Sequence, residues 1–288
     1  MGNTPTCQSS PSSKRTTGVV TVSRSDYGIY QPVLRQIQAH SELELSLFAT
    51  GMHLSSDFGS TIRAIEEDGF PVTERVEMLL SSDTPEGIAK SIGVGILGFA
   101  QVFSRSRPDI LLVLGDRFEM YASVCAALPF KIPVAHIHGG EVTEGAIDES
   151  IRHAITKMSH LHFASTDIYA NRLRQLGEED WRITVTGAPG LDNISSIPLL
   201  SEEKTAERFG FDIAKPLLVV TFHPVTLEYE QTEEHITNLL KALDQIEAQL
   251  LFTYPNADTS GRSIINKITE FASNLQNATV VINAGQQA

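Results

Sequence analysis

Residues 136–150, HIHGGEVTEGAIDES, bring together many groups that can take up and release protons. Two histidines, three glycines and four carboxylates follow directly after an apolar run. Asp148 and Glu149 stand just before a helical pattern, so they also suit the positive end of a helix. Carboxylates close to histidines shift one another's pKa values apart and can supply both an acid and a base. The stretch therefore predicts acid–base chemistry.

Further polar groups follow other apolar runs. They are Arg24 in SRSDYG, Asp116 and Arg117 in GDRFE, His223 in TFHP and Asn256 in YPNAD. Taken singly, Asp116 also fits a helix N-cap, Arg117 a surface ion pair and His223 a turn. Because parallel α/β sheets bind ligands beyond the carboxyl ends of their strands, we expect these groups to gather at one cleft.

His136 and His138 alternate with Ile137, so both are expected on one face of a strand end. This spacing would permit a metal site. A third ligand at a diagnostic spacing is absent from the sequence, and we therefore expect neither a metal nor a cofactor.

Short β-branched runs alternate with longer amphipathic ones from Gly18 onward, which predicts a doubly wound α/β fold. The runs DILLVLG and IPVAHIH are nearly continuous in apolar residues, as expected of parallel strands covered on both faces. After a turn-rich stretch the pattern restarts. We predict a disordered leader over residues 1–17, a Rossmann-like domain over 18–191 and a partial Rossmann-like domain over 192–288.

The stretch GVGILG, residues 93–98, matches the glycine pattern of dinucleotide-binding loops. That motif must follow a strand and open a helix, so that the helix N-terminus faces the pyrophosphate. Here it lies inside a predicted helix that begins near Pro85. We interpret these glycines as close helix packing.

Composition excludes several classes of protein. The net charge of −13 and the lack of a long basic run disfavour nucleic-acid binding. The longest apolar stretch, Ile92 to Phe103, is too short to cross a membrane, and no signal peptide opens the chain. Two cysteines, Cys7 and Cys125, provide no disulfide framework. We expect a cytoplasmic protein.

Several motifs together resemble one enzyme family. GDRFEM, HIHGGEVTEGAIDESIRHAITKMSHLHF, TGAPGLDN, TFHPVT and YPNADTSG look like the hydrolysing UDP-N-acetylglucosamine 2-epimerases of sialic and legionaminic acid synthesis. The resemblance runs from about Gly18 to Asn277. It implies two Rossmann-like domains in a GT-B-like arrangement, with a UDP-sugar in the cleft and a homodimer or higher homo-oligomer. It also implies the reaction: loss of the C2 proton and of UDP gives a glycal, and water then adds with inverted C2.

The resemblance also implies roles for individual residues. The candidates for proton transfer are Asp116, Asp148, His138, Glu141 and Glu149. Arg117 and His223 match positions that stabilise the diphosphate, with His223 counted among the catalytic residues. Arg24 and Asn256 match nucleotide-binding positions.

The sequence departs from the family in two places. Some relatives have a catalytic Glu where this chain has His138, so either the imidazole or Glu141 takes that role. Relatives also continue through a glycine- and serine-rich loop and a final helix, so the second domain is expected to be incomplete and activity impaired. An inactive nucleotide-sugar-binding remnant is therefore the alternative, and a GT-B glycosyltransferase is a weaker one.

Overall fold

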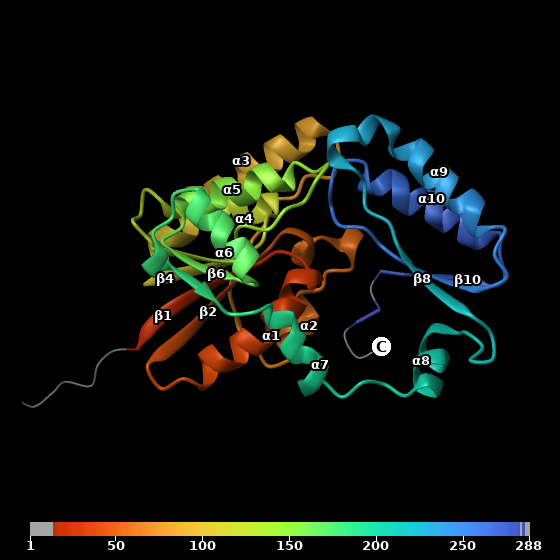
Figure 1. The fold of residues 1–288 in the computed structure, drawn as a ribbon, viewed down its shortest axis with the longest axis horizontal. Coiled ribbons are helices and arrows are strands. Elements are labelled where there is room, and N and C mark those ends of the chain that lie inside the picture. Colours follow the sequence, from red (N-terminus) through yellow and green to blue (C-terminus); the bar gives the residue numbers. More distant parts are fainter. Residues whose placement is uncertain (1–13, 283, 286–288) are drawn as a thin grey trace, which may run out of the picture.

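The computed structural model describes residues 14–282 and 284–285 and contains two parallel sheets (Figure 1). The predicted leader lies mostly outside the described residues. Its last residues were assigned wrongly, because strand β1 already begins at Arg15 and pairs with Leu43 of the next strand. The β-branched Thr16 and Thr17 suit a strand, and the backbone N–H of Thr16 donates to Asp109 at 2.7 Å.

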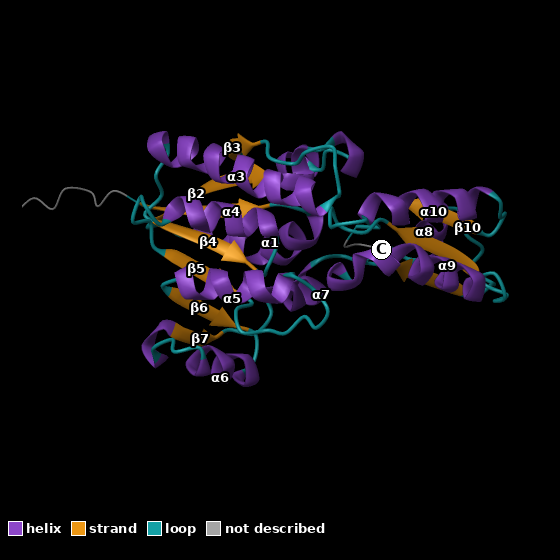
Figure 2. Ribbon diagram, turned by 90° about the horizontal axis from the view of Figure 1, so that it is seen from above, coloured by secondary structure: helices purple, strands orange, loops and turns teal. Residues whose placement is uncertain are grey.

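The first sheet has seven strands in the order β3-β2-β1-β4-β5-β6-β7. Its strands are β1 (Arg15–Thr21), β2 (Leu43–Thr50), β3 (Val72–Val76), β4 (Ile110–Leu114), β5 (Val134–Ile137), β6 (Leu161–Ala164) and β7 (Ile183–Val185). The pairs between neighbouring strands are parallel throughout this sheet. All carboxyl ends therefore lie along one edge, as Figure 2 shows for β4 and its neighbours.

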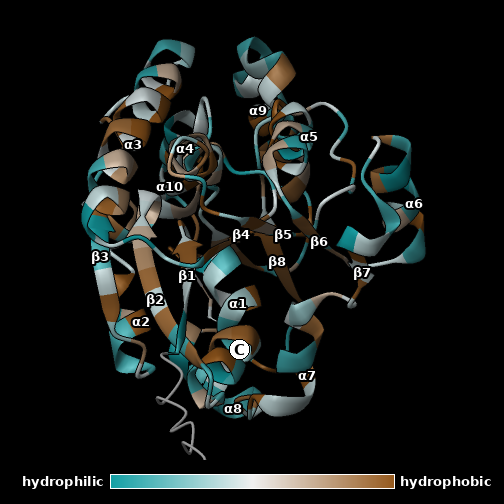
Figure 3. Cartoon of the chain, turned by 90° about the vertical axis from the view of Figure 1, so that its left-hand side faces the viewer, coloured by the Kyte–Doolittle hydropathy of each residue, from teal (hydrophilic) through white to brown (hydrophobic). Residues whose placement is uncertain are grey.

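Helices cover both faces of this sheet. On one face lie α3 (Pro85–Arg105), α4 (Phe118–Ala127) and α5 (Asp148–Met158), and on the other α1 (Arg24–Ala39), α2 (Ile62–Glu67) and α7 (Asp192–Ser196) (Figure 1). Helix α6 (Asp167–Gln175) precedes β7. The central strands are buried, and Figure 3 shows hydrophobic residues concentrated along β4 and β5. Coverage on both faces explains why these strands are almost entirely apolar, with His136 of β5 as a buried polar residue.

The second sheet has the order β10-β9-β8, formed by β8 (Leu217–Thr221), β9 (Gln249–Thr253) and β10 (Ala278–Val281). Helices α9 (Thr232–Leu243) and α10 (Gly261–Ser273) cover one face, where Phe252, Ile264 and Ile268 are buried. Helix α8 (Glu202–Phe209) precedes β8. The predicted α/β class with two Rossmann-like units is confirmed. We call residues 15–196 the first unit and residues 202–281 the second.

The predicted domain boundary at residues 191/192 falls just before α7. This helix packs against α1 of the first unit, and Asn193 donates to the backbone oxygen of Gly28 at 2.7 Å. The boundary itself stays a prediction.

Helix α3 contains the glycine-rich stretch, as predicted. A Cβ on Gly98 would lie 2.6 Å from Val76 Cγ1, and one on Gly95 would lie 2.7 Å from Met78 Cε. These glycines therefore permit close packing. Among the described helices, α3 is also the one whose length and hydropathy would suffice to cross a membrane, although buried core helices pass the same test. Phe99, Val102 and Phe103 on this helix are buried in the first unit's core.

Candidate active site

The polar groups predicted to gather do lie at the carboxyl ends of strands. Asp116 and Arg117 follow β4, and His138 and Glu141 follow β5. Asp148 and Glu149 form the first turn of α5, and Arg24 opens α1 directly after β1. In the second unit, His223 follows β8 and Asn256 follows β9. A hydrogen bond and an ion pair between the two units bring the strand ends of the first unit close to those of the second.

Two arginines of the first unit, Arg152 and Arg117, form ion pairs with three carboxylates. Arg152 of α5 donates to Asp116 through a very short ion pair. Arg117 Nη1 lies 2.5 Å from Asp258 Oδ1, and Arg117 Nη2 lies 3.2 Å from Glu119 Oε1. Burial opposes the positive charge of Arg117, but Asp258 and Glu119 outweigh it and keep its pKa well above the ordinary value.

Asp148 has no such arginine partner among the described residues. Among the described residues, no cation lies within ion-pair distance of its carboxyl group. Burial, followed by the negative charge of Asp258, raises the pKa of Asp148 to about 6, although Arg117 pulls it down. Burial also raises the pKa of Asp116, against the opposing charges of Arg152 and Arg117. Carboxyl groups with raised pKa values suit proton transfer near neutral pH.

His138 and Glu141 form one hydrogen-bonded group. His138 Nδ1 lies 2.6 Å from Glu141 Oε1, and the Ser165 hydroxyl donates to the same oxygen at 2.6 Å. His138 has φ of +64°, a conformation that non-glycine residues rarely adopt outside functional sites and turns. The neighbouring Gly140 is required, because a Cβ there would lie 2.5 Å from the Tyr169 carbonyl oxygen. The turn therefore fixes the imidazole against a carboxylate.

His136 has a structural role instead. Its Nε2–H donates to the Gly115 carbonyl oxygen at 2.7 Å, and Nδ1 accepts from the Thr156 hydroxyl at 3.2 Å. Complete burial lowers the pKa of His136 to about 3, so the ring is neutral. The expected alternation with His138 fails because β5 ends at Ile137 and the backbone turns at His138.

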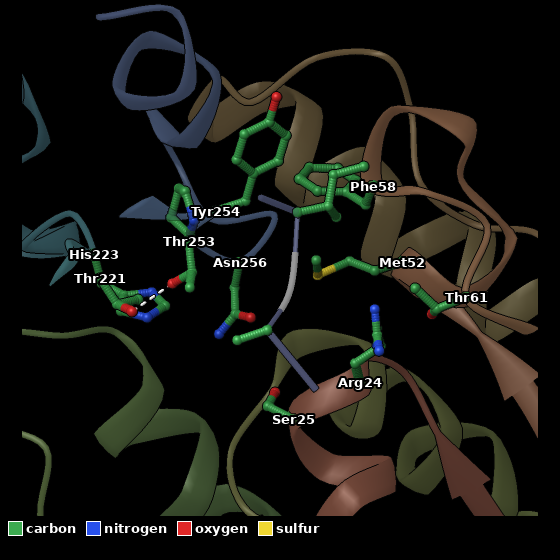
Figure 4. Close-up of a pocket in the computed structure, with 13 residues that line it drawn as sticks. Arg24, Ser25, Met52, Phe58, Thr61, Thr221, His223, Thr253, Tyr254 and Asn256 are labelled. Carbon is green, nitrogen blue, oxygen red and sulfur yellow. Dashed lines mark hydrogen bonds between the residues drawn. The ribbon is translucent and has the colours of Figure 1, made fainter. Parts of the chain in front are cut away.

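A cavity of about 290 Å³ lies between the units. Arg24, His223 and Asn256 line it, and Figure 4 shows them around the same space as Met52 and Phe58. Burial lowers the pKa of His223, although the charge of Asp258 opposes this. Burial, helped by the nearby Arg208, also lowers the pKa of Arg24. The two residues predicted to bind the nucleotide, Arg24 and Asn256, therefore share one cavity with His223, which was predicted to stabilise the diphosphate.

Arg117 does not line this cavity. Its guanidinium group is instead held by Asp258 and Glu119. Glu149 accepts from the Thr143 backbone N–H at 3.3 Å, and His153 lies 3.7 Å from it. The catalytic and binding roles assigned to these residues stay predictions. Within the described ranges, no three His, Cys, Asp or Glu side chains are grouped as a metal site.

Sequence reasoning missed three charged residues of the cleft: Arg152, Asp258 and Glu119. Arg152 lies four positions after Asp148, on the helix whose apolar face was recognised, so its helical spacing was an available signal. Asp258 belongs to the YPNAD motif, in which only Asn256 was selected. Glu119 is fully buried, which nothing in the sequence indicates.

Comparison with known proteins gives one consistent result. Residues 35–287 match the family described as UDP-N-acetylglucosamine 2-epimerase. The chain is 38% identical over 278 residues to a GDP/UDP-N,N'-diacetylbacillosamine 2-epimerase (hydrolyzing) of Campylobacter jejuni, covering 96% of this chain and 72% of that one. It is 37% identical to a UDP-N,N'-diacetylbacillosamine 2-epimerase (hydrolyzing) of Legionella pneumophila, covering 88% and 67%.

The fold has solved counterparts. A UDP-GlcNAc 2-epimerase from Neisseria meningitidis bound to UDP-GlcNAc superposes with a TM-score of 0.72 at 19% sequence identity. The match covers 92% of this chain and 72% of that one. An epimerase from Methanocaldococcus jannaschii in complex with UDP-GlcNAc and UDP also gives 0.72, at 17% identity and with coverage of 92% and 73%. The expected GT-B-like arrangement of two units is confirmed.

Proposed function

Because this chain belongs to the UDP-N-acetylglucosamine 2-epimerase family, we propose that it is a hydrolysing UDP-sugar 2-epimerase. It converts a UDP-linked 2-acetamido sugar to the free 2-epimer and UDP. The observation that carries this proposal is the cleft itself, where acid–base groups of the first unit lie beside a cavity lined by Arg24, His223 and Asn256. We further propose a cytoplasmic homo-oligomer that acts in sialic or legionaminic acid synthesis.

The substrate is a UDP-2,4-diacetamido-trideoxy sugar, with UDP-N-acetylglucosamine as the second possibility. Two relatives at 37–38% identity are named for N,N'-diacetylbacillosamine. A relative from Neisseria meningitidis named UDP-N-acetylglucosamine 2-epimerase is 31% identical. The diphosphate of either substrate occupies the cavity, where Arg24 supplies positive charge and Asn256 supplies an amide.

The first half of the reaction is an elimination: the proton on C2 and the UDP group on C1 are lost. A carboxylate takes the C2 proton while the C1–O bond to UDP breaks, which leaves a glycal and UDP. Asp148 is suited to this step, because its raised pKa makes it a stronger base than an ordinary aspartate while it still ionises near neutral pH. Cations near the diphosphate stabilise the charge that develops on the leaving group.

The second half adds water to the glycal. The oxygen of water bonds to C1, and C2 receives a proton on the face opposite the one from which the first proton was removed. Asp116, held by Arg152, and the imidazole of His138, held by Glu141, are the groups available for this proton transfer. Glu141 already accepts two hydrogen bonds, so it orients His138 and the imidazole moves the proton.

The test is turnover in deuterated water, followed by NMR with each of the two UDP-sugars. We expect free 2-epimerised sugar that carries deuterium at C2, together with UDP. Asp116→Asn is the control variant and should release neither product while still binding UDP. A wild-type chain that binds UDP but releases no sugar from either substrate would refute the proposed activity.

A further inference from the structure

The second unit reaches the acid–base groups through the loop between β8 and α9. The Thr226 hydroxyl accepts from the backbone N–H of Ile147 at 2.9 Å. The backbone N–H of Leu227 donates to the Gly145 carbonyl oxygen at 3.2 Å. Ile147 directly precedes Asp148 and caps its helix. The position of Asp148 therefore depends on docking of the second unit.

The loop between β9 and α10 makes a second connection, through Asp258. Its carboxylate lies 2.5 Å from the Arg117 guanidinium, across the interface between the units, and the two side chains are 14% and 9% exposed. Arg117 is otherwise held within its own unit by the fully buried Glu119. An ion pair with so little exposure is weakly screened, so its charges act strongly on neighbouring groups.

A third connection joins the same units through Arg262, which contacts none of the acid–base groups in a described hydrogen bond or ion pair. Arg262 Nη2 lies 2.5 Å from Asp57 Oδ2, and these side chains are 36% and 43% exposed. The backbone N–H of Arg262 also donates to Asp83 at 2.9 Å. The chain thus offers two Arg–Asp pairs of equal length between the units, one buried and one more exposed, and Asp57 and Arg262 share a small pocket with Asp258.

We propose that Asp258 is a positioning residue for the epimerase reaction proposed above: docking of the second unit brings its carboxylate onto Arg117 and thereby sets the charge that surrounds Asp148. The expected changes in rate rest on the proposed epimerase function. The charges that act most on Asp148 are those of Asp258, Arg117 and Asp116, and Asp57 and Arg262 are not among them.

The charges around Asp148 give the direction of the effect. Burial is the largest influence on its pKa; next, Asp258 raises it, Arg117 lowers it and Asp116 raises it. Arg152 and Glu149 lie on its own helix, and His223 approaches Asp258 from the end of β8. Replacing Asp258 by asparagine removes a negative neighbour and leaves Arg117 with Glu119 as its remaining ion-pair partner. Both changes favour the ionised form of Asp148, so its pKa falls.

The kinetic experiment compares Asp258→Asn, Asp258→Glu and Asp57→Asn with the wild-type chain. The rate should rise with pH as Asp148 ionises. We expect Asp258→Asn to shift this rise to a pH lower by about one unit. The kcat of Asp258→Asn should fall about 10- to 100-fold, because Arg117 loses its fixed position. Its KM should change less. Asp258→Glu should recover part of both effects. Asp57→Asn should leave this rise in place, and an equal shift in both Asp→Asn variants would overturn the proposal.

A second readout does not depend on turnover. Carbon-13 NMR of carboxyl-labelled aspartate follows the titration of Asp148, whose signal is identified by its loss in Asp148→Asn. The proposal expects this titration to move toward acid in Asp258→Asn and to stay in place in Asp57→Asn. An unmoved titration in folded Asp258→Asn would overturn it even where the wild-type chain turns over. A moved titration in a chain that releases no sugar would refute the epimerase function alone.

Discussion

Asp148→Asn should make the protein more stable while abolishing turnover. Burial and the charge of Asp258 raise the pKa of Asp148 from 3.8 to about 6. The shift of about 2 units corresponds to a cost of about 3 kcal/mol for holding the ionised carboxyl group in the folded protein. Asparagine removes the charge while keeping a similar shape, so it relieves this cost.

The sign of the pH dependence follows from the two protonation equilibria. Below about pH 3.8 the carboxyl group is neutral in both states and Asp148 imposes no electrostatic cost. Between pH 3.8 and 6 the unfolded chain ionises while the folded protein keeps its proton, so the cost grows with pH and is constant above about 6. We expect Asp148→Asn to gain about 1.5 kcal/mol at pH 5 and about 3 kcal/mol at pH 7.5.

Urea unfolding at pH 5, 6 and 7.5 measures this gain directly. At pH 7.5, Tm should rise by roughly 5–10 °C for a chain of this size. Asp167→Asn is the matched control, because Asp167 also stands in the first turn of a helix, α6, but is exposed. A stability difference between Asp148→Asn and the wild-type chain that does not change with pH would refute the reasoning.

Three further outcomes are expected. Asp116→Asn should abolish deuterium incorporation at C2 without unfolding the chain, which circular dichroism checks; retained turnover would remove Asp116 from the mechanism. His136→Ala should cost about 2–3 kcal/mol in urea unfolding, because the Gly115 carbonyl oxygen loses its buried donor. Since burial lowers the pKa of His136 from 6.5 to about 3, the wild-type chain should lose stability as pH falls from 6.5 toward 3, and this variant should lose less. Gly98→Val should destabilise α3 by about 1–3 kcal/mol through overpacking against Val76, with KM unchanged; an unaltered urea midpoint would show that α3 tolerates the added side chain.

Much of the fold could be predicted because the buried central strands are mostly apolar. β4 and β5 are covered on both faces, and their short, mostly apolar runs next to turn residues favour strands over helices. β3 was missed. It is an edge strand with the sequence VTERV, and its half-exposed, mixed composition gives too short an alternation to identify. Strands can thus be predicted from the sequence where they are fully buried, but not at the half-exposed edge of the sheet.

The approximate place of the site could also be predicted, because the carboxyl ends of parallel strands must share one edge. This rule brought Asp116, Glu141 and Asp148 together without any knowledge of the structure. It says nothing about which charges pair. Asp258 stands 141 residues from Arg117, and only the docking of the second unit makes them neighbours. Their pairing depends on a relative placement of two units that no local pattern encodes.

The pairing of charges in turn separates two acids that look alike in the sequence. Asp148 and Glu149 are adjacent and both open α5. Glu149 has the Thr143 backbone N–H and His153 nearby, whereas Arg152 and Arg117 are taken by Asp116, Asp258 and Glu119. Asp148 is therefore left partly buried beside like charges, which raises its pKa into the range useful for proton transfer. The raised pKa of Asp148 thus comes first from burial and next from the charge of Asp258, and the arginines nearby pair with other carboxylates.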